Sequence, residues 1–304
     1  MANILLRSPQ YISASQAGAS YATLELSVDS TLIYSITNNV DASTAVLFEI
    51  SELCRDYLDV VYDGTYNSFS VDISATLTFY DSSDVVVGTP STITHKGFDG
   101  YGDFIDGHNP TITSDTIMQS NTVMYVPEGV AGVIPYESSG AIAYQAFNTS
   151  ATSATVAGTS VTISRTCDPK YTPIKITFVN KFGALQDIYL HKKSTRSIGV
   201  EREMYKANTI SGTGSYQTYN HVKKNLKSVG SERMTANTGF VSDNVNEAFK
   251  QLMLSEQIWA TISGNVLPIS ITNSDFEFKT SLNDKMVNYT MEFEYAFDAI
   301  NNIR

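Results

Sequence analysis

The residues most able to do chemistry lie in the stretch GFDGYGDFIDGHNP, residues 97–110, which holds three aspartates, four glycines and one histidine. A helix-flanked calcium loop places oxygen ligands at alternate positions and ends on a bidentate glutamate at the twelfth. Counted from Asp99, the third position is Tyr101 and the twelfth is Pro110, so the calcium pattern fails. Zinc requires several histidine or cysteine ligands, and the stretch has one histidine and no cysteine.

Glycine beside aspartate is typical of tight turns, because glycine tolerates positive φ and aspartate caps its own backbone. The stretch therefore predicts an irregular surface loop. The alternative is a bound cation, for which the candidate ligands are Asp99, Asp103 and Asp106. These three carboxylates could instead line a cleft in a glycan-degrading enzyme, which needs paired acids. The chain has no GxSxG, HExxH or Walker-type motif, and we expect no catalytic residue and no cofactor.

The net charge of −11 is unevenly distributed along the chain. Residues 1–164 carry three basic and seventeen acidic residues, whereas residues 165–304 carry seventeen basic and fourteen acidic ones. Such asymmetry indicates parts of the chain that face different surroundings. The basic stretch predicts either a solvated face or a subunit contact to an acidic neighbour, and we consider nucleic acid an unlikely partner. The candidate interface residues are Lys192, Lys193, Arg196, Lys223, Lys224 and Lys227.

Two further expectations concern location. Neither Cys54 nor Cys167 belongs to a CxxC motif, so we expect free thiols and assembly in a reducing cytoplasm. The sequence shows no signal peptide and no run near the ~20 apolar residues of a membrane span. We therefore expect no membrane partner.

Residues 1–166 predict an acidic, antiparallel β-sandwich. Alternating apolar residues at 71–79, and again at 24–28 and 32–36 around Asp29-Ser30, are typical of half-buried strands and a hairpin. A short helix is expected at 51–58. The Ser/Thr/Ala-rich part, 111–166, predicts short strands or a mobile connector.

Residues 167–304 predict an α+β module, which would make the whole chain mainly β. A domain boundary is expected at Cys167–Pro173, which is rich in turn formers. A hairpin should begin at Ile174, and a helix is expected over 243–258. Strands should follow that helix to give a hairpin–helix–hairpin order, with the helix packed on an antiparallel sheet. The apolar stripe of the helix consists of Val245, Phe249, Leu252 and Met253.

Several segments of the chain resemble the virion structural proteins of tailed bacteriophages. They are VNKFGALQDIYLHKKS, NTGFVSDNVNEAFKQLMLSEQIW and TSLNDKMVNYTMEFEYAFDAINNIR, with VLFEISELCRDYLD and GFDGYGDFIDG in the first half. The last part is also similar to tail-tube and distal-tail modules, which assemble as rings. The resemblance implies a virion location after assembly in the host cytoplasm, in the tail or baseplate, with copies of itself and other virion proteins as partners.

Two other functions stay open for such a protein. A receptor-binding tail adhesin would hold host surface glycan on aromatic loops, with Tyr101, Phe104 and Tyr125 stacking on sugar faces. A tail-associated enzyme would degrade glycan.

Overall fold

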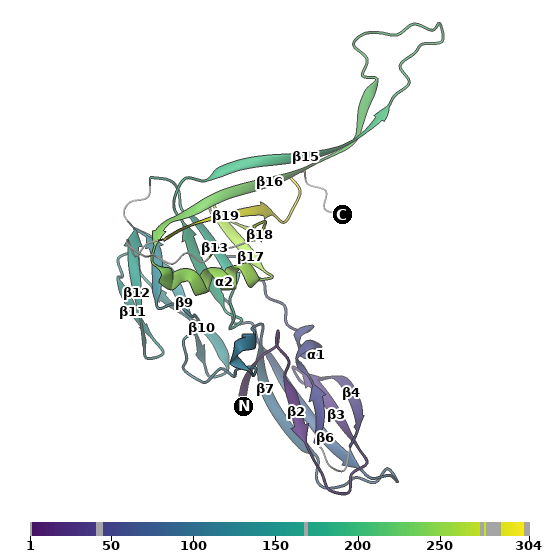
Figure 1. The fold of residues 1–304 in the computed structure, drawn as a ribbon, viewed down its shortest axis with the longest axis vertical. Helices are drawn as coiled ribbons and strands as arrows, with labels where there is room; N and C mark the ends of the chain where they lie inside the picture. The colour runs from purple at the N-terminus through teal and green to yellow at the C-terminus, as the bar shows by residue number, and fades with distance from the viewer. Residues whose placement is uncertain (1, 41–44, 167–169, 274–276, 278–286, 301–304) are drawn as a thin grey trace.

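The computed structural model describes residues 2–40, 45–166, 170–273, 277 and 287–300 (Figure 1). The chain is mainly β, with 52% strand and 7% helix, as predicted. Within the described residues, no helix is long and apolar enough to cross a membrane.

The first part of the chain forms a five-stranded sheet. Its strands, in spatial order, are β1 (Ala2–Leu5), β7 (Ser91–Phe98), β6 (Val71–Tyr80), β3 (Tyr21–Val28) and β4 (Thr31–Asn39). The alternation predicted for 71–79 is observed, since every second residue of β6 from Val71 is buried. Asp29 and Ser30 have φ values of 48° and 68°, which is the geometry of a two-residue hairpin turn. The sheet is mixed rather than antiparallel, because β1 pairs with β7 in parallel.

A second layer covers one face of this sheet. It consists of the antiparallel pair β2 (Tyr11–Ala14) and β5 (Val46–Glu49), followed by the short helix α1 (Ser51–Arg55). Phe48 and Cys54 join the core of the five-stranded sheet. Burial raises the pKa of the free Cys54 thiol to about 12, so this cysteine fills space in the core and is not a reactive thiolate. Cys167 lies outside the described residues.

The Ser/Thr/Ala-rich part forms short strands, the first of the two predicted alternatives. They are β8 (Val123–Pro127), β9 (Gly132–Ser138), β10 (Ala141–Phe147), β11 (Ser153–Val156) and β12 (Thr159–Thr166). β9 pairs with β10, and the other three form a sheet in the order β11-β12-β8. Their side chains share a core with Tyr189. This part therefore packs against the last region of the chain.

A seven-stranded sheet organises the rest of the chain. Its strands, in spatial order, are β14 (Leu185–Leu190), β13 (Ile174–Val179), β17 (Ile258–Ile262), β18 (Asn265–Ile271), β19 (Val287–Tyr295), β16 (Lys223–Val241) and β15 (Thr195–Lys206). A 3-10 turn η2 (Asp243–Val245) leads into α2 (Asn246–Leu254), which packs on one face of the sheet (Figure 1). Phe249, Leu252 and Phe293 belong to one buried core. The helix ends four residues earlier than predicted, because Ser255 is extended.

The first and last parts of the chain also touch. Val60 and Tyr62, which follow α1, are buried in one cluster with Val179 of β13 and Leu185 of β14. The predicted division into domains 1–166 and 167–304 stays a prediction, and residues 167–169 lie outside the described residues.

Candidate assembly interface

The most prominent feature of the molecule is a two-stranded arm, residues 195–232, which extends β15 and β16 beyond the rest of the fold (Figure 1). β15 and β16 pair from Thr195↔Thr235 to Lys206↔Lys223, and residues 207–222 close the loop. β16 pairs with β19 only from Arg233 onward. All twelve residues of β15 are exposed. The arm is therefore held to the body at one end, where the Ala299 N–H also donates to the Gly230 carbonyl.

One face of the arm carries three exposed apolar side chains, with Arg202 between two of them. Paired residues of antiparallel strands share a face, and residues two apart in a strand do so too. Arg196 pairs with the buried Met234, so Ile198, Val200 and Met204 lie on the face that, nearer the body, contributes to the core. Their exposed fractions are 58%, 41% and 61%. The core-facing side of the sheet thus continues onto the arm, where these three side chains are exposed among the described residues.

The far half of the arm is basic. Residues 204–231 contain four lysines and no aspartate or glutamate. Lys223, Lys224 and Lys227 lie on β16, and Lys206 is paired with Lys223. Among the described residues, none of these four ammonium groups has a hydrogen bond or an ion pair.

The other predicted interface residues lie at the base of the arm. Lys192 and Lys193 are exposed just before β15. The Arg196 guanidinium donates to the Tyr295 hydroxyl at 2.8 Å and lies over that ring. The structure therefore brings the six predicted residues onto one hairpin and its base. Sequence reasoning missed Lys206, although it belongs to the same acid-free run, and it missed the apolar face.

The loop 97–110 has a different role from the arm. Asp99 is buried and accepts a hydrogen bond from Arg55 Nε at 3.0 Å. Asp103 forms ion pairs of 2.9 Å with both Lys181 and Lys250. Asp106 is exposed in a 3-10 turn, η1 (Phe104–Asp106). Two of the three aspartates thus face basic groups, and no cluster of three or more His, Cys, Asp or Glu suited to a metal exists among the described residues.

The two lysines also perturb the titration of Asp103. Hydrogen bonds from Lys250 and Lys181 hold the pKa of its carboxyl below the ordinary value. Neither lysine was identified from the sequence, because the pairs join residues 78 and 147 positions apart. The loop therefore ties the first part of the chain to α2 and to the turn between β13 and β14 by charge.

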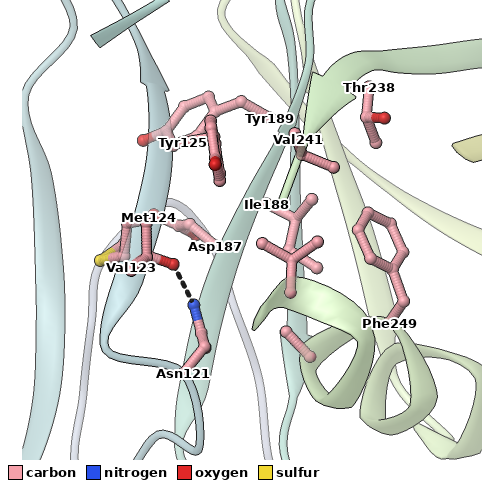
Figure 2. Close-up of a pocket in the computed structure, with 12 residues that line it drawn as sticks. Asn121, Val123, Met124, Tyr125, Asp187, Ile188, Tyr189, Thr238, Val241 and Phe249 are labelled. Carbon is pink, nitrogen blue, oxygen red and sulfur yellow. Dashed lines mark hydrogen bonds between the residues drawn. The ribbon is translucent and has the colours of Figure 1, made fainter. Parts of the chain in front are cut away.

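The three aromatic residues proposed for sugar binding lie in different surroundings. Phe104 is fully exposed, whereas the Arg7 guanidinium lies 5.1 Å above the centre of the Tyr101 ring. Phe104 also borders an open groove of about 910 Å³ between residues 8–11 and 102–109. Tyr125 lines an interior cavity instead (Figure 2).

That interior cavity lies between β8, β14 and α2, and Asp187, Ile188 and Phe249 are among its lining residues (Figure 2). Its volume of about 30 Å³ leaves room for water-sized molecules but not for a sugar or a cofactor.

Asp187 is a deeply buried carboxylate, with a side chain that is 1% exposed. Tyr66 and Thr177 donate hydrogen bonds to its two oxygens, and Lys175 Nζ lies 4.0 Å away. Burial raises the pKa of Asp187. Through the hydrogen bond from Tyr66, Asp187 ties the segment that follows α1 to β14.

Among the described residues, the arm is the clearest candidate for an interaction surface. Comparison with protein families, curated proteins and solved structures finds no match to this chain.

Proposed function

We propose that this chain is a structural component of a tailed-phage virion, in the tail or baseplate, and that it works without catalysis through ring-type contacts between identical subunits. Its location is then the virion, after assembly in the host cytoplasm, and its partners are copies of itself and other virion proteins. The resemblance of its sequence segments supports the virion setting. The apolar, basic arm is the observation that supports assembly.

The argument from the arm is energetic. An isolated two-stranded hairpin is at best marginally stable in water, yet this one extends beyond the body with Ile198, Val200 and Met204 exposed on a single face. Contiguous exposed apolar surface marks interaction sites in soluble proteins. β15 is also an edge strand, with free backbone groups that another chain can pair with. A neighbouring subunit that covers this face would stabilise the arm and bury the apolar side chains.

Mass measurement of the purified protein tests the proposal. A ring component should form hexamers, dodecamers or longer polymers in multi-angle light scattering. Replacing Ile198, Val200 and Met204 together by threonine should shift the population to monomers, because threonine keeps the strand preference but removes apolar contact. The matched control replaces three exposed apolar residues outside the arm, Leu32, Leu47 and Val85, by threonine. A control variant that dissociates equally, or a wild-type chain that stays monomeric at all concentrations, would count against the proposal.

The two alternatives give different results in the same measurements. A glycan-binding adhesin should form trimers and bind an immobilised glycan through the groove beside Phe104, and a Phe104→Ala variant should lose that binding. A glycan-degrading enzyme should release reducing sugar.

A further inference from the structure

Two clusters of unpaired charge stand out among the described residues. The first is the far half of the arm, where Lys206, Lys223, Lys224 and Lys227 have no hydrogen-bond or ionic partner among the described residues. Lys206 and Lys223 share the face of Met204, whereas Lys224 and Lys227 lie on the opposite face. A partner for the arm therefore needs carboxylates and apolar side chains together.

Many carboxylates of the acidic first part are already engaged within the chain. Asp29 accepts from the Asp72 backbone at one end of β3, and Asp84 accepts from the Tyr21 hydroxyl at the other end, both at 2.9 Å. Asp81 accepts from two backbone N–H groups of its own turn. These groups hold local structure and are poorly placed to receive cations from another molecule.

The segment 52–63, in and after α1, is different. Glu52, Asp56 and Asp59 are exposed, and none of their carboxylates forms a hydrogen bond or an ion pair with any described residue. The one basic residue of the segment, Arg55, forms ion pairs with Asp99 and Glu256. It therefore does not compensate the three exposed carboxylates of the segment. This is the second place where unpaired charge gathers, and its sign is opposite to that of the arm.

The same segment also presents apolar surface on a fixed backbone. Tyr57 and Val61 are 50% and 55% exposed between the acidic residues. Val60 and Tyr62 are each 3% exposed, and their burial against β13 and β14 anchors the segment. Little conformational entropy is then lost when a partner binds, because the exposed side chains project from an ordered chain.

We infer that the arm of one copy docks on segment 52–63 of a neighbouring copy, with its distal lysines facing Glu52, Asp56 and Asp59. This inference rests on the proposed function, and it names the surface that receives the arm. The two surfaces are different, so the contact is head-to-tail, and repetition of such a contact closes a ring when the rotation allows it. Complementary charge selects the partner and the register, while the apolar side chains supply most of the contact energy.

Charge reversal on both surfaces tests the pairing. The first variant carries Lys223→Glu, Lys224→Glu and Lys227→Glu, and the second carries Glu52→Lys, Asp56→Lys and Asp59→Lys. Each should raise the dissociation constant of the assembly by roughly tenfold or more, since three charge pairs become repulsive. The chain that carries all six changes should regain the wild-type value within about threefold, because the pairs are restored with opposite signs. Sedimentation velocity measures the constants, and circular dichroism checks that each variant is folded.

A matched control separates pairing from net charge. Glu25, Asp106 and Glu128 are exposed carboxylates elsewhere, without a hydrogen bond to their side chains among the described residues. Glu25→Lys, Asp106→Lys and Glu128→Lys, added to the arm reversal, should not restore assembly. If they restore it as well as the 52–59 changes do, the inference is overturned.

Other outcomes identify what failed. If the 52–59 reversal assembles like wild type while the arm reversal does not, the arm docks elsewhere, so the inference is wrong and the proposed function stands. If the wild-type chain never self-associates, both the inference and the proposed function fail.

Fluorescence anisotropy with a labelled oligothymidylate tests whether the arm binds nucleic acid instead. Tight, salt-sensitive binding that the arm reversal abolishes, with assembly unaffected by either reversal, would assign the arm to nucleic acid and overturn the inference.

Discussion

Asp103 Oδ1 accepts a hydrogen bond from Lys250 Nζ at 2.9 Å, although the two residues are 147 positions apart in the sequence. The other oxygen of Asp103 receives Lys181 at the same distance. The loop that carried the candidate metal ligands thus contacts α2 and the turn between β13 and β14. These contacts predict how the protein responds to acid.

Replacing Asp103 by asparagine should cost about 1 kcal/mol of stability at neutral pH and low salt, because two partly exposed ion pairs are lost. The folded-state pKa of Asp103 is depressed, so its contribution is present above the unfolded pKa of about 4 and is lost as pH falls through the folded value. Urea unfolding between pH 2.5 and 7 should show a flatter acid limb for Asp103→Asn than for wild type. Asp106→Asn, which removes an exposed carboxylate, should follow wild type; identical profiles for all three chains would contradict the role of the ion pairs.

Tyr66→Phe should destabilise the fold by about 1–3 kcal/mol, because the buried Asp187 carboxylate loses a hydrogen-bond donor. Burial already raises the pKa of Asp187, and loss of the Tyr66 hydroxyl should raise it further. A group with a raised folded pKa contributes stability at low pH that is lost as pH rises through that value. The cost of Tyr66→Phe should therefore be larger at pH 7 than at pH 4. Tyr57→Phe is the control, since Tyr57 is half exposed; an equal cost at both pH values would show that Asp187 is not the group affected.

Phe249→Ala should cost about 3–5 kcal/mol, because a fully buried ring leaves a cavity between α2 and the seven-stranded sheet. Phe249 is 2% exposed, and its ring centre lies 4.9 Å from that of Tyr289. Leu254→Ala, on the same helix but 48% exposed, should cost less than about 0.5 kcal/mol. Urea denaturation followed by tryptophan fluorescence measures both, and similar costs for the two variants would mean that α2 does not pack as described.

The sequence predicted those parts of the fold that local patterns determine. The alternation in β6, the turn at Asp29-Ser30 and the apolar stripe of α2 each follow from periodicity and turn chemistry within about ten residues. The parallel pairing of β1 with β7 did not follow, because it joins residues about ninety positions apart. The ion pairs of Asp103 were missed for the same reason.

The candidate interface was predicted only in part. The sequence identified its basic residues as a lysine-rich run. It did not show whether such a run forms a solvated face of the body or a projecting arm. Ile198 and Val200 alternate as they would in an ordinary half-buried strand, and only the structure shows that they and Met204 are exposed among the described residues. An assembly contact satisfies the same hydrophobic pattern as a core contact, so periodicity alone cannot separate the two.

Trypsin should reveal whether the arm is covered in the assembled protein. The loop 207–222 is exposed and is flanked by Lys206 and Lys223, so the dissociated chain should be cut there early. Assembly should slow those cuts by roughly tenfold or more, since a bound neighbour shields the arm and opening then requires dissociation. Lys170 is exposed at the predicted domain boundary and provides an internal control, because cleavage after it should not depend on assembly through the arm. High salt, which screens the lysines, should restore fast cleavage of the arm and leave the rate at Lys170 unchanged. Equal cleavage of the arm in assembled and dissociated protein would place the subunit contact elsewhere, and the edge of β4 would then be the next surface to test.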